Sequence, residues 1–501
     1  MNKAKTTYRN IIKVTSIFGA VQVLQIFISL VRTKFAAIFI GAAGMGILGL
    51  FTSSFNVIYF IAGLGLNFSA TREIAQFTHE NDHPAANKAY SIARKYVTYM
   101  SIAAMILVVV FSQQLSQYTF GNTHYTLGFI LLSITILLKS ITNINTAVLQ
   151  GLRRIREMVK SSFFGALLGL FTCIPLYYFF KEDGIVPGMV LTVILSFLVS
   201  YYFIRKTSIT NTRIGLKDAI SGGAFMVKLG MVMMAGAIVG SAITYLINIF
   251  IVRNGSVADL GLYNAGVGLS SQYVSLVFTA LSVDFFPKLS TVNTDNKKVS
   301  EMVNQQAEIT FLILLPILVT MILTSPILIK VLLTNEFDRI SNFARITALF
   351  TAFQAAAYTL SNIPLAKGDK KIFFVWNSLF PGCCALLFFT FGYYFFGLNG
   401  LALGIGLVNV AHFTGIAIVC ARRYGYRMNK NSLYFFAVII VMTGATFLAV
   451  SLWPNVIGYI IGCILLILSV FFSVFYLHKC MDLRELLSQF LGMFKKAKAL
   501  A

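Results

Sequence analysis

The sequence predicts an all-α polytopic membrane protein with about fourteen transmembrane helices. The 501 residues are 57% hydrophobic and only 11% charged, and their mean hydropathy is +0.80. A soluble globular domain carries about 25% charged residues. Apolar runs of about 20 residues, long enough to cross a bilayer as a helix, recur along the whole chain. The alternating pattern of a barrel strand does not occur in the sequence, which leaves helices as the spanning elements.

Each predicted helix is an apolar run of spanning length. The first six runs are 14–40, 48–68, 97–118, 125–148, 161–180 and 185–204. The next six are 229–252, 262–286, 309–333, 340–363, 372–396 and 398–420, and the last two are 432–452 and 455–477. Between the first two runs, the glycine-rich stretch GAAGMGILG (Gly41–Gly49) is predicted to form a tight turn.

Lysine and arginine concentrate at the N-terminus and in every second connection. The fourth connection, for example, holds Arg153, Arg154, Arg156 and Lys160. The odd-numbered connections hold only Lys181, Arg253, Lys330 and Arg339. By the positive-inside rule, both termini are predicted to be cytoplasmic. The net charge of +23 therefore reflects topology and attraction to anionic lipid headgroups, and no nucleic-acid partner is predicted.

Two distant stretches of the sequence share one pattern. LYYFFKEDGIVPG (Leu176–Gly188) aligns with GYYFFGLNGLALG (Gly392–Gly404) at a shift of 216, since 393 − 177 = 216. Ala43–Gly49 aligns with Ala258–Asn264 at a shift of 215, since 258 − 43 = 215. The duplicated unit contains an even number of predicted helices, so both copies enter the membrane from the same side. We predict two parallel six-helix repeats that form two lobes and work by alternating access, the alternative being a duplication kept for packing alone.

The repeat predicts the division of the chain. The predicted parts are an N-lobe (1–208), an amphipathic cytoplasmic linker (209–228), a C-lobe (229–427), two extra helices (428–478) and an amphipathic cytoplasmic tail (479–501). The linker and the tail mix apolar residues with Lys and Arg, as helices at a membrane surface do.

Five basic residues lie within or at the ends of the apolar runs and form a predicted cationic, substrate-binding lumen: Arg32, Lys34, Lys139, Arg253 and Arg345. A basic side chain at a helix centre costs about 2.5–3.5 kcal/mol, so several of them are not expected to face lipid. Lys139 lies deepest. The alternative for Arg32, Lys34 and Arg253 is that their side chains reach back to the membrane surface. Arg345 has a similar alternative, because it lies about one turn from the start of its helix. Because Glu308 is expected at a solvated helix end and no acid lies as deep as Lys139, the lumen favours an anionic guest such as pyrophosphate.

Polar uncharged residues add hydrogen-bonding groups to the same interior. The predicted polar lumen consists of Gln25, Asn56, Asn145, Asn248 and Gln272, and Asn143 is a further polar residue on the fourth helix. These side chains could meet sugar hydroxyls, and hydrogen bonding between helices is the alternative. The His and Cys residues show no metal-ligand spacing, and no phosphate-binding loop occurs in the sequence. We therefore predict no catalytic residue, no metal and no cofactor.

The stretch GAAGMGILGLFTSSFNVIYFIAGLGLNFSATREIAQ (Gly41–Gln76), together with the repeat, resembles the multidrug/oligosaccharidyl-lipid/polysaccharide (MOP) exporter superfamily. Within it, the start of the chain is similar to Wzx-type polysaccharide flippases. The resemblance implies a flippase, not an enzyme, in the bacterial cytoplasmic membrane. It would move undecaprenyl-pyrophosphate-linked oligosaccharide, such as an O-antigen repeat unit, from the cytoplasmic to the outer leaflet. A proton or sodium ion as coupling ion, and polymerase or assembly proteins as partners, are part of the same expectation.

Two other transporters fit the same sequence features. A lipid II flippase of the MurJ kind shares the helix count and a basic cavity. A multidrug antiporter of the superfamily typically has twelve helices and needs a buried carboxylate, so the two extra helices count against it. A membrane glycosyltransferase or polymerase would need acidic catalytic residues or a large outer loop, and the sequence has neither.

Overall fold

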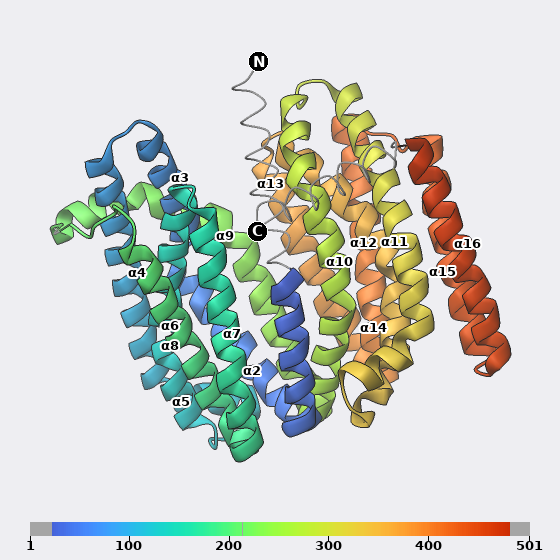
Figure 1. Ribbon diagram of the computed structural model, residues 1–501, viewed down its shortest axis with the longest axis horizontal. Helices are drawn as coiled ribbons and strands as arrows, with labels where there is room; N and C mark the ends of the chain where they lie inside the picture. Colours follow the sequence, from blue (N-terminus) through green and yellow to red (C-terminus); the bar gives the residue numbers. More distant parts are fainter. Residues whose placement is uncertain (1–22, 213, 481–501) are drawn as a thin grey trace, which may run out of the picture. The chain divides into compact units, whose positions relative to one another are not determined.

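The computed structural model describes residues 23–212 and 214–480, which form helices joined by short connections, without a strand in these ranges (Figure 1). A helix covers residues 23–39. The further helices are α2 (Gly41–Gly63), α3 (Leu66–His79), α4 (His83–Val110), α5 (Ser112–Phe120), α6 (Thr126–Gly151), α7 (Ile155–Phe180), η1 (Lys181–Gly184), α8 (Ile185–Arg205), α9 (Leu216–Asn254), α10 (Val257–Thr291), α11 (Asn296–Leu332), η2 (Asn335–Ile340), α12 (Ser341–Ala366), α13 (Lys370–Phe374), the π-helix η3 (Val375–Leu379), α14 (Phe380–Tyr424), α15 (Lys430–Leu452) and α16 (Val456–Cys480).

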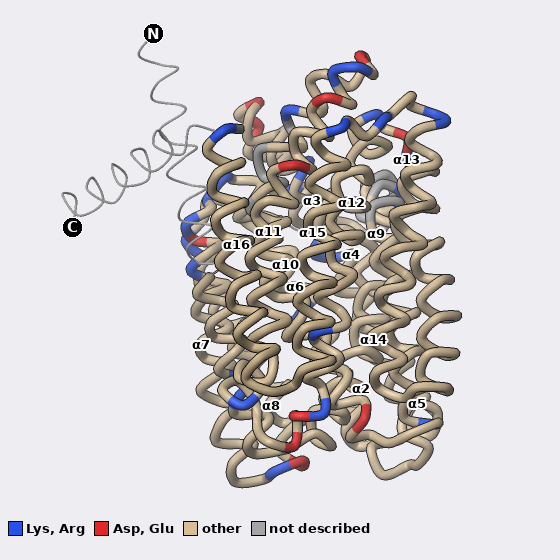
Figure 2. Tube along the Cα trace, turned by 90° about the vertical axis from the view of Figure 1, so that its right-hand side faces the viewer, with Lys and Arg blue, Asp and Glu red and all other residues tan. Residues whose placement is uncertain are grey.

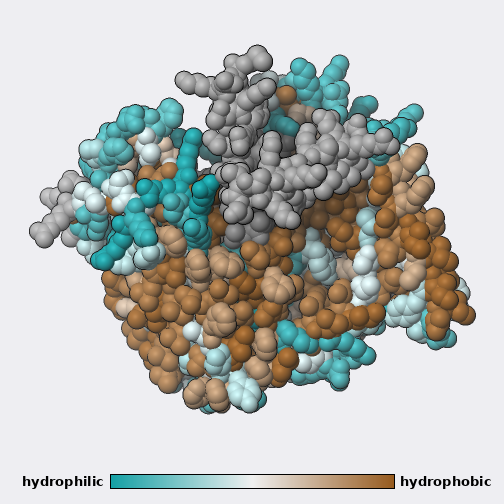
Figure 3. All heavy atoms as spheres, in the orientation of Figure 1, coloured by the Kyte–Doolittle hydropathy of each residue, from teal (hydrophilic) through white to brown (hydrophobic). Residues whose placement is uncertain are grey.

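The helices have the length and composition of membrane spans. Within the described ranges, nine stretches are long and apolar enough to cross a bilayer. Two of them, Ile155–Arg205 with 51 residues and Lys370–Tyr424 with 55, are too long for a single crossing and contain a break. Lys and Arg lie mainly toward helix ends (Figure 2), and hydrophobic side chains cover the helix middles (Figure 3). The predicted all-α membrane fold is confirmed, and the count of fourteen spans stays a prediction.

The described residues form two compact units. The first contains the described residues up to Ala265 together with Val331–Phe337, and the second contains Gly266–Lys330 and the described residues from Asp338 to position 480. The core of the first unit lies among α3, α4, α6, α8 and α9. In the second unit, one core lies among α10, α11, α12 and α15. The predicted lobe boundaries stay a prediction.

The predicted linker and tail are only partly described. α9 runs without interruption from Leu216 to Asn254, so the part of the predicted linker after Leu216 forms its first turns. The predicted tail lies outside the described residues from position 481, as does the N-terminal part of the first predicted helix, up to position 22.

The duplicated stretch has the same backbone conformation in both copies. Lys181, at the end of α7, has φ 53° and ψ −127°. Gly397, 216 positions later inside α14, has φ 56° and ψ −135°. A Cβ atom added to Gly184 or to its counterpart Gly400 would lie 2.3 Å or 1.8 Å from the carbonyl oxygen of the residue eight positions earlier. The repeat is therefore present in the backbone, and it places the same tight helix-to-helix turn in each copy.

The glycine-rich stretch Gly41–Gly49 is helical, and its prediction as a tight turn is wrong. Only Gly41 has a positive φ, of 63°, and α2 begins there. The glycines serve a close contact between α2 and the start of α10 within the first unit. A Cβ on Gly46 would lie 1.9 Å from the Val257 carbonyl oxygen, and one on Gly261 would lie 1.8 Å from the Ala42 carbonyl oxygen. Because 261 − 46 = 215, equivalent glycines of the two repeats pack reciprocally, as small residues do between membrane helices.

Candidate functional site

Two helices of the first unit bring a lysine, two aromatic rings and two amides together. α2 carries Phe55, Asn56 and Tyr59 within about one turn, and α6 carries Lys139 and Asn143 one turn apart. Residues one turn apart lie on the same helix face, and α2 packs against α6. We call these five residues the Lys139 cluster.

The ammonium group of Lys139 rests on ring faces. Its Nζ lies 4.9 Å from the ring centroid of Phe55 and 4.7 Å from that of Tyr59. These two rings are stacked, with 6.0 Å between centroids and 10° between planes. Nζ also donates a hydrogen bond to Asn56 Oδ1 at 3.4 Å. Cation–π contact and one amide oxygen thus hold the lysine in place.

Among the side chains that the structure describes, no carboxylate lies within ion-pair distance of the Lys139 Nζ. An ammonium group has three donors, and Asn56 takes only one of them. Aromatic faces offset part of the cost of taking the cation out of water but leave its charge uncompensated. The cluster is therefore suited to receive an anion.

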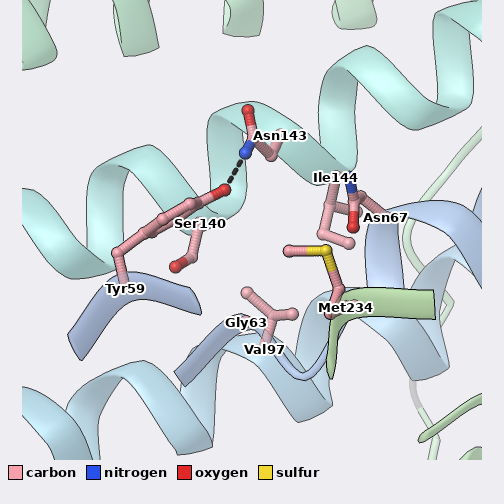
Figure 4. Close-up of a pocket in the computed structure, with 9 residues that line it drawn as sticks. Tyr59, Gly63, Asn67, Val97, Ser140, Asn143, Ile144 and Met234 are labelled. Atoms are coloured by element: carbon pink, nitrogen blue, oxygen red, sulfur yellow. Dashed lines mark hydrogen bonds between the residues drawn. The ribbon is translucent and has the colours of Figure 1, made fainter. Parts of the chain in front are cut away.

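A small pocket with both polar and apolar lining residues adjoins the cluster on one side of Tyr59 (Figure 4). Asn143 of α6 donates a hydrogen bond to the Tyr59 hydroxyl. Asn67 and Ser140 also line the pocket, and the buried Ser140 Oγ has no hydrogen-bond partner in the described chain. The cavity volume of about 10 Å³ has room for roughly one water. A sugar does not fit this pocket in the conformation described here.

Arg345 has structural partners in the second unit. It is only 8% exposed, its Nε donates to the Ile322 carbonyl at 3.1 Å, and one terminal nitrogen donates to the Tyr459 hydroxyl at 3.2 Å. Pro326, four residues after Ile322 in α11, has no N–H to donate to that carbonyl. Arg345 replaces the missing donor together with the Ser325 hydroxyl, which donates to the same carbonyl at 3.4 Å, and this role accounts for the burial of Arg345 without a substrate. Its predicted part in the lumen stays a prediction.

The other three basic residues lie nearer helix ends or surfaces. Lys34 Nζ donates to the Leu333 carbonyl at 2.5 Å, just after the end of α11. Arg32 is exposed on the helix over residues 23–39. Arg253 is exposed near the end of α9 and donates to the Tyr118 carbonyl at 2.9 Å. None of the three joins the Lys139 cluster, and their predicted part in a lumen stays a prediction.

The predicted polar residues divide between several surroundings. Asn56 belongs to the Lys139 cluster, whereas Asn145 donates to Ser200 Oγ at 2.9 Å and links α6 to α8. Asn248 is buried, Gln272 is half-buried, and each has a side-chain oxygen without a hydrogen-bond partner in the described chain. Gln25 is half-buried. Asn145 thus serves the alternative role of an interhelical hydrogen bond.

Glu308 is not at a solvated helix end, and that expectation is wrong. α11 begins at Asn296, so Glu308 lies inside the helix and is only 8% exposed. Its Oε1 accepts hydrogen bonds from Asn429 Nδ2 at 2.9 Å and Ser432 Oγ at 3.1 Å. Asn429 is the N-cap of α15, where a helix end favours a negative charge. Glu308 therefore fastens α15 to α11.

A family model for polysaccharide biosynthesis proteins matches residues 36–342, a range that includes the whole Lys139 cluster. The chain belongs to this family. One relative of this family member is the "Putative O-antigen transporter" of Shigella flexneri, 26% identical over 290 residues, or 54% of this chain. That match spans 65% of the relative, slightly less than two thirds of its length. The "Lipid III flippase" of Escherichia coli strain K12 is 19% identical over 362 residues, which cover 71% of this chain and 85% of the relative.

Solved structures share the fold of this polysaccharide biosynthesis protein. The lipid II flippase MurJ in an inward closed conformation has a TM-score of 0.69 at 15% identity, covering 93% of this chain and 99% of that chain. An inward-facing multidrug resistance transporter of the MATE family in the MOP superfamily has a TM-score of 0.66 at 14% identity, covering 81% and 98%. The predicted resemblance is confirmed for the polysaccharide biosynthesis family, and the fold is the one found in a transporter of the MOP superfamily. The protein is a multi-pass membrane protein, and the relatives named here are transporters and flippases rather than enzymes.

The aromatic half of the site was not predicted from the sequence. Phe55 and Tyr59 lie in an apolar run with many aromatic residues, so their composition alone does not distinguish them. A signal exists in retrospect, because both lie within one turn of Asn56 on α2. The rings contact Lys139 only because α2 packs against α6. This packing cannot be read from the sequence of either helix alone.

Proposed function

We propose that this protein is a flippase for undecaprenyl-pyrophosphate-linked oligosaccharide, such as an O-antigen or other surface-glycan repeat unit. It carries the lipid from the cytoplasmic to the outer leaflet of the bacterial cytoplasmic membrane by alternating access between its two repeats. Both termini face the cytoplasm. The observation that carries the proposal is the Lys139 ammonium group, held on two aromatic rings without a carboxylate partner in the described chain.

The chemistry of the Lys139 cluster matches the head of such a lipid. A pyrophosphate loses its hydration shell when it leaves the membrane surface, and a cation in a low-dielectric site offsets that cost. Lysine suits this role because its charge is compact and two of its donors remain available. The rings of Phe55 and Tyr59 and the amides of Asn56 and Asn143 offer apolar faces and hydrogen bonds to the adjoining sugar.

The lipid tail requires no site of its own. The polyprenyl chain stays in the bilayer, since moving it into a protein cavity gains nothing over lipid tails that are equally apolar. The basic residues at the cytoplasmic helix ends attract the anionic lipid to the entry side. A proton or sodium gradient drives the cycle, and polymerase or assembly proteins receive the product.

The lipid II flippase is the second candidate, favoured by the structural likeness to MurJ over nearly the whole chain. It shares the need for a cationic site, and only the sugar part of the substrate distinguishes the two functions. A multidrug antiporter fits less well, because the half-buried Lys139, without an acidic partner among the described side chains, repels the cationic drugs that such transporters export.

The test uses the source bacterium with the gene for this chain deleted. We expect a complete lipid-linked repeat unit to accumulate on the cytoplasmic leaflet, as measured by mass spectrometry of extracted lipids and accessibility of the glycan in inside-out vesicles. Wild type should relieve the accumulation and Lys139→Ala should not. Lys206→Ala is a matched control, because Lys206 also lies over a tyrosine ring, 4.2 Å from the Tyr202 centroid, but at an exposed helix end. An unchanged lipid-linked glycan pool, with altered drug tolerance instead, would reject the proposal, and accumulation of lipid II would favour the second candidate.

A further inference from the structure

A second polar site lies in the first unit at the end of α6 away from the cytoplasmic connections. It is an open pocket of about 1000 Å³, lined by Gln113, Gln114, Gln117, Tyr118, Gly121, Thr123 and Arg253. Three amides, a phenol and a guanidinium thus surround a space of the size that binds small ligands, about 300–1,000 Å³. The described lining includes no Asp or Glu and no aliphatic side chain.

The short helix α5 lies at one end of the first unit (Figure 1), with one face in contact with the protein and the other exposed. Ser116 Oγ donates to the Asn122 carbonyl at 2.7 Å, and the hydroxyls of Thr119 and Tyr245 are 2.6 Å apart, which ties α5 to α9. Phe120 packs at 4.0 Å between ring centroids on Tyr125. The opposite face, with Gln113, Gln114, Gln117 and Tyr118, is exposed. A rigid backbone therefore presents polar side chains that hold few contacts within the protein.

Arg253 completes the pocket from another helix. It donates one hydrogen bond to the Tyr118 carbonyl, and its guanidinium carbon lies 5.4 Å from the Tyr118 ring centroid. A guanidinium has five N–H donors in a planar fork. The fork is held in place by the ring, and its remaining donors can form a bidentate pair with a carboxylate or a phosphate.

We propose that this pocket, the α5 pocket, binds the sugar part of the transported lipid, and that it selects an oligosaccharide with an acidic group. The amides of Gln113 and Gln114 offer donors and an acceptor to neighbouring hydroxyls. Gln117 already donates from Nε2 to the Gly121 carbonyl at 3.2 Å and offers its remaining donor and its side-chain oxygen. Tyr118 offers a ring face, and Arg253 takes the acid. Lys139 lies 13 residues from the start of α6, or about 20 Å along its axis, which is the separation that one extended head group would have to bridge between the Lys139 cluster and the α5 pocket. The inference rests on the proposed function, because it assigns this end of the protein to the glycan.

Binding to the purified full-length protein in nanodiscs of neutral lipid tests the α5 pocket. The probes are tetragalacturonate, which is acidic, and maltotetraose, which is neutral, with binding followed by saturation-transfer NMR. We expect tetragalacturonate to bind more tightly, and Arg253→Gln to weaken it about tenfold, as loss of a charge-assisted bidentate pair does. Gln117→Ala should weaken both sugars a few-fold. Arg205→Gln is the matched control, since Arg205 is also exposed and lies 4.6 Å from the centroid of Tyr201, and it should change nothing.

Several results would overturn the inference. These are equal binding of the two sugars, no binding of either one, or equal loss in Arg253→Gln and Arg205→Gln. Loss of sugar binding when anionic lipid is added to the nanodiscs would identify the pocket as a headgroup site instead. The proposed function fails separately, because it is measured by accumulation of lipid-linked glycan in cells and depends on Lys139 rather than on Arg253.

Discussion

The backbone at Lys181 offers a quantitative test of the duplicated architecture. Its φ of 53° and ψ of −127° belong to a region that suits glycine, and holding a side chain there costs about 1–3 kcal/mol. Its repeat counterpart, Gly397, has nearly the same angles without that cost. Glycine is more flexible in the unfolded chain, which subtracts about 0.5–1 kcal/mol. Lys181→Gly is therefore expected to raise the free energy of unfolding by about 1 kcal/mol.

The assay is SDS-induced unfolding of the purified protein, followed by circular dichroism. We expect the unfolding midpoint of Lys181→Gly to move to a higher SDS fraction and that of Gly397→Lys to move to a lower one. Lys181→Gln separates backbone strain from charge, because glutamine keeps a Cβ atom and should leave the midpoint near that of wild type. If Lys181→Gln stabilises the protein as much as Lys181→Gly does, the reasoning from backbone strain is refuted.

Three further predictions concern packing, a buried hydrogen bond and pH. Gly46→Val should destabilise the protein by about 1–3 kcal/mol, because a Cβ atom at this position would lie 1.9 Å from the Val257 carbonyl oxygen. The same SDS titration measures the effect, and an unchanged unfolding midpoint would contradict the close contact. Arg345→Met should cost about 1–3 kcal/mol because it removes the nearer donor of the buried Ile322 carbonyl and leaves only the Ser325 hydroxyl, at 3.4 Å. An Arg345 that served only substrate binding would instead lower transport without a change in stability. Burial raises the pKa of Asp369. Hydrogen bonds from Tyr424, Arg423 and the Ile372 backbone, together with the positive charge of Arg423, have the larger effect and hold this pKa below its usual value of 3.8. A carboxylate whose pKa is lowered by folding stabilises the fold at pH values above its unfolded-state pKa. Asp369→Asn should therefore lower the melting temperature at pH 6, and the difference in melting temperature from wild type should shrink as the pH falls below about 4. A difference that stays constant with pH would count against the ion pair.

Hydropathy predicted the all-α membrane fold, because it is read from each segment alone, and comparison of two segments predicted the repeated turn at Lys181 and Gly397. The predicted end at position 396 and start at 398 enclose Gly397, where the backbone turns. Helix ends outside the membrane were poorly predicted: α11 starts at Asn296 instead of 309, since its first turns are polar and carry no apolar signal. That error also hid the burial of Glu308.

The candidate site was predicted only as far as isolated charges allow. Lys139 stands out because a charged side chain in the middle of a membrane span is energetically costly and is usually found at a functional site. Arg345 stands out for the same reason, yet its partner is a carbonyl oxygen on another helix, which Pro326 leaves without a backbone donor. Sequence patterns do not distinguish these two cases, because the difference lies in which helix packs against each residue. The close contact of Gly46 with α10 escaped prediction for the same reason.

The most direct test of the account is transport in proteoliposomes that contain only this protein and a polyprenyl-pyrophosphate-linked oligosaccharide. The rate at which the glycan becomes accessible on the opposite leaflet is measured with an added glycosidase that cannot cross the membrane. We expect Lys139→Gln to lower the initial rate at least about tenfold, since it removes the charge that compensates the pyrophosphate, and Lys139→Arg to retain part of the activity. Transport by Lys139→Gln at the wild-type rate would contradict the central claim that the Lys139 cluster receives the anionic head of the lipid.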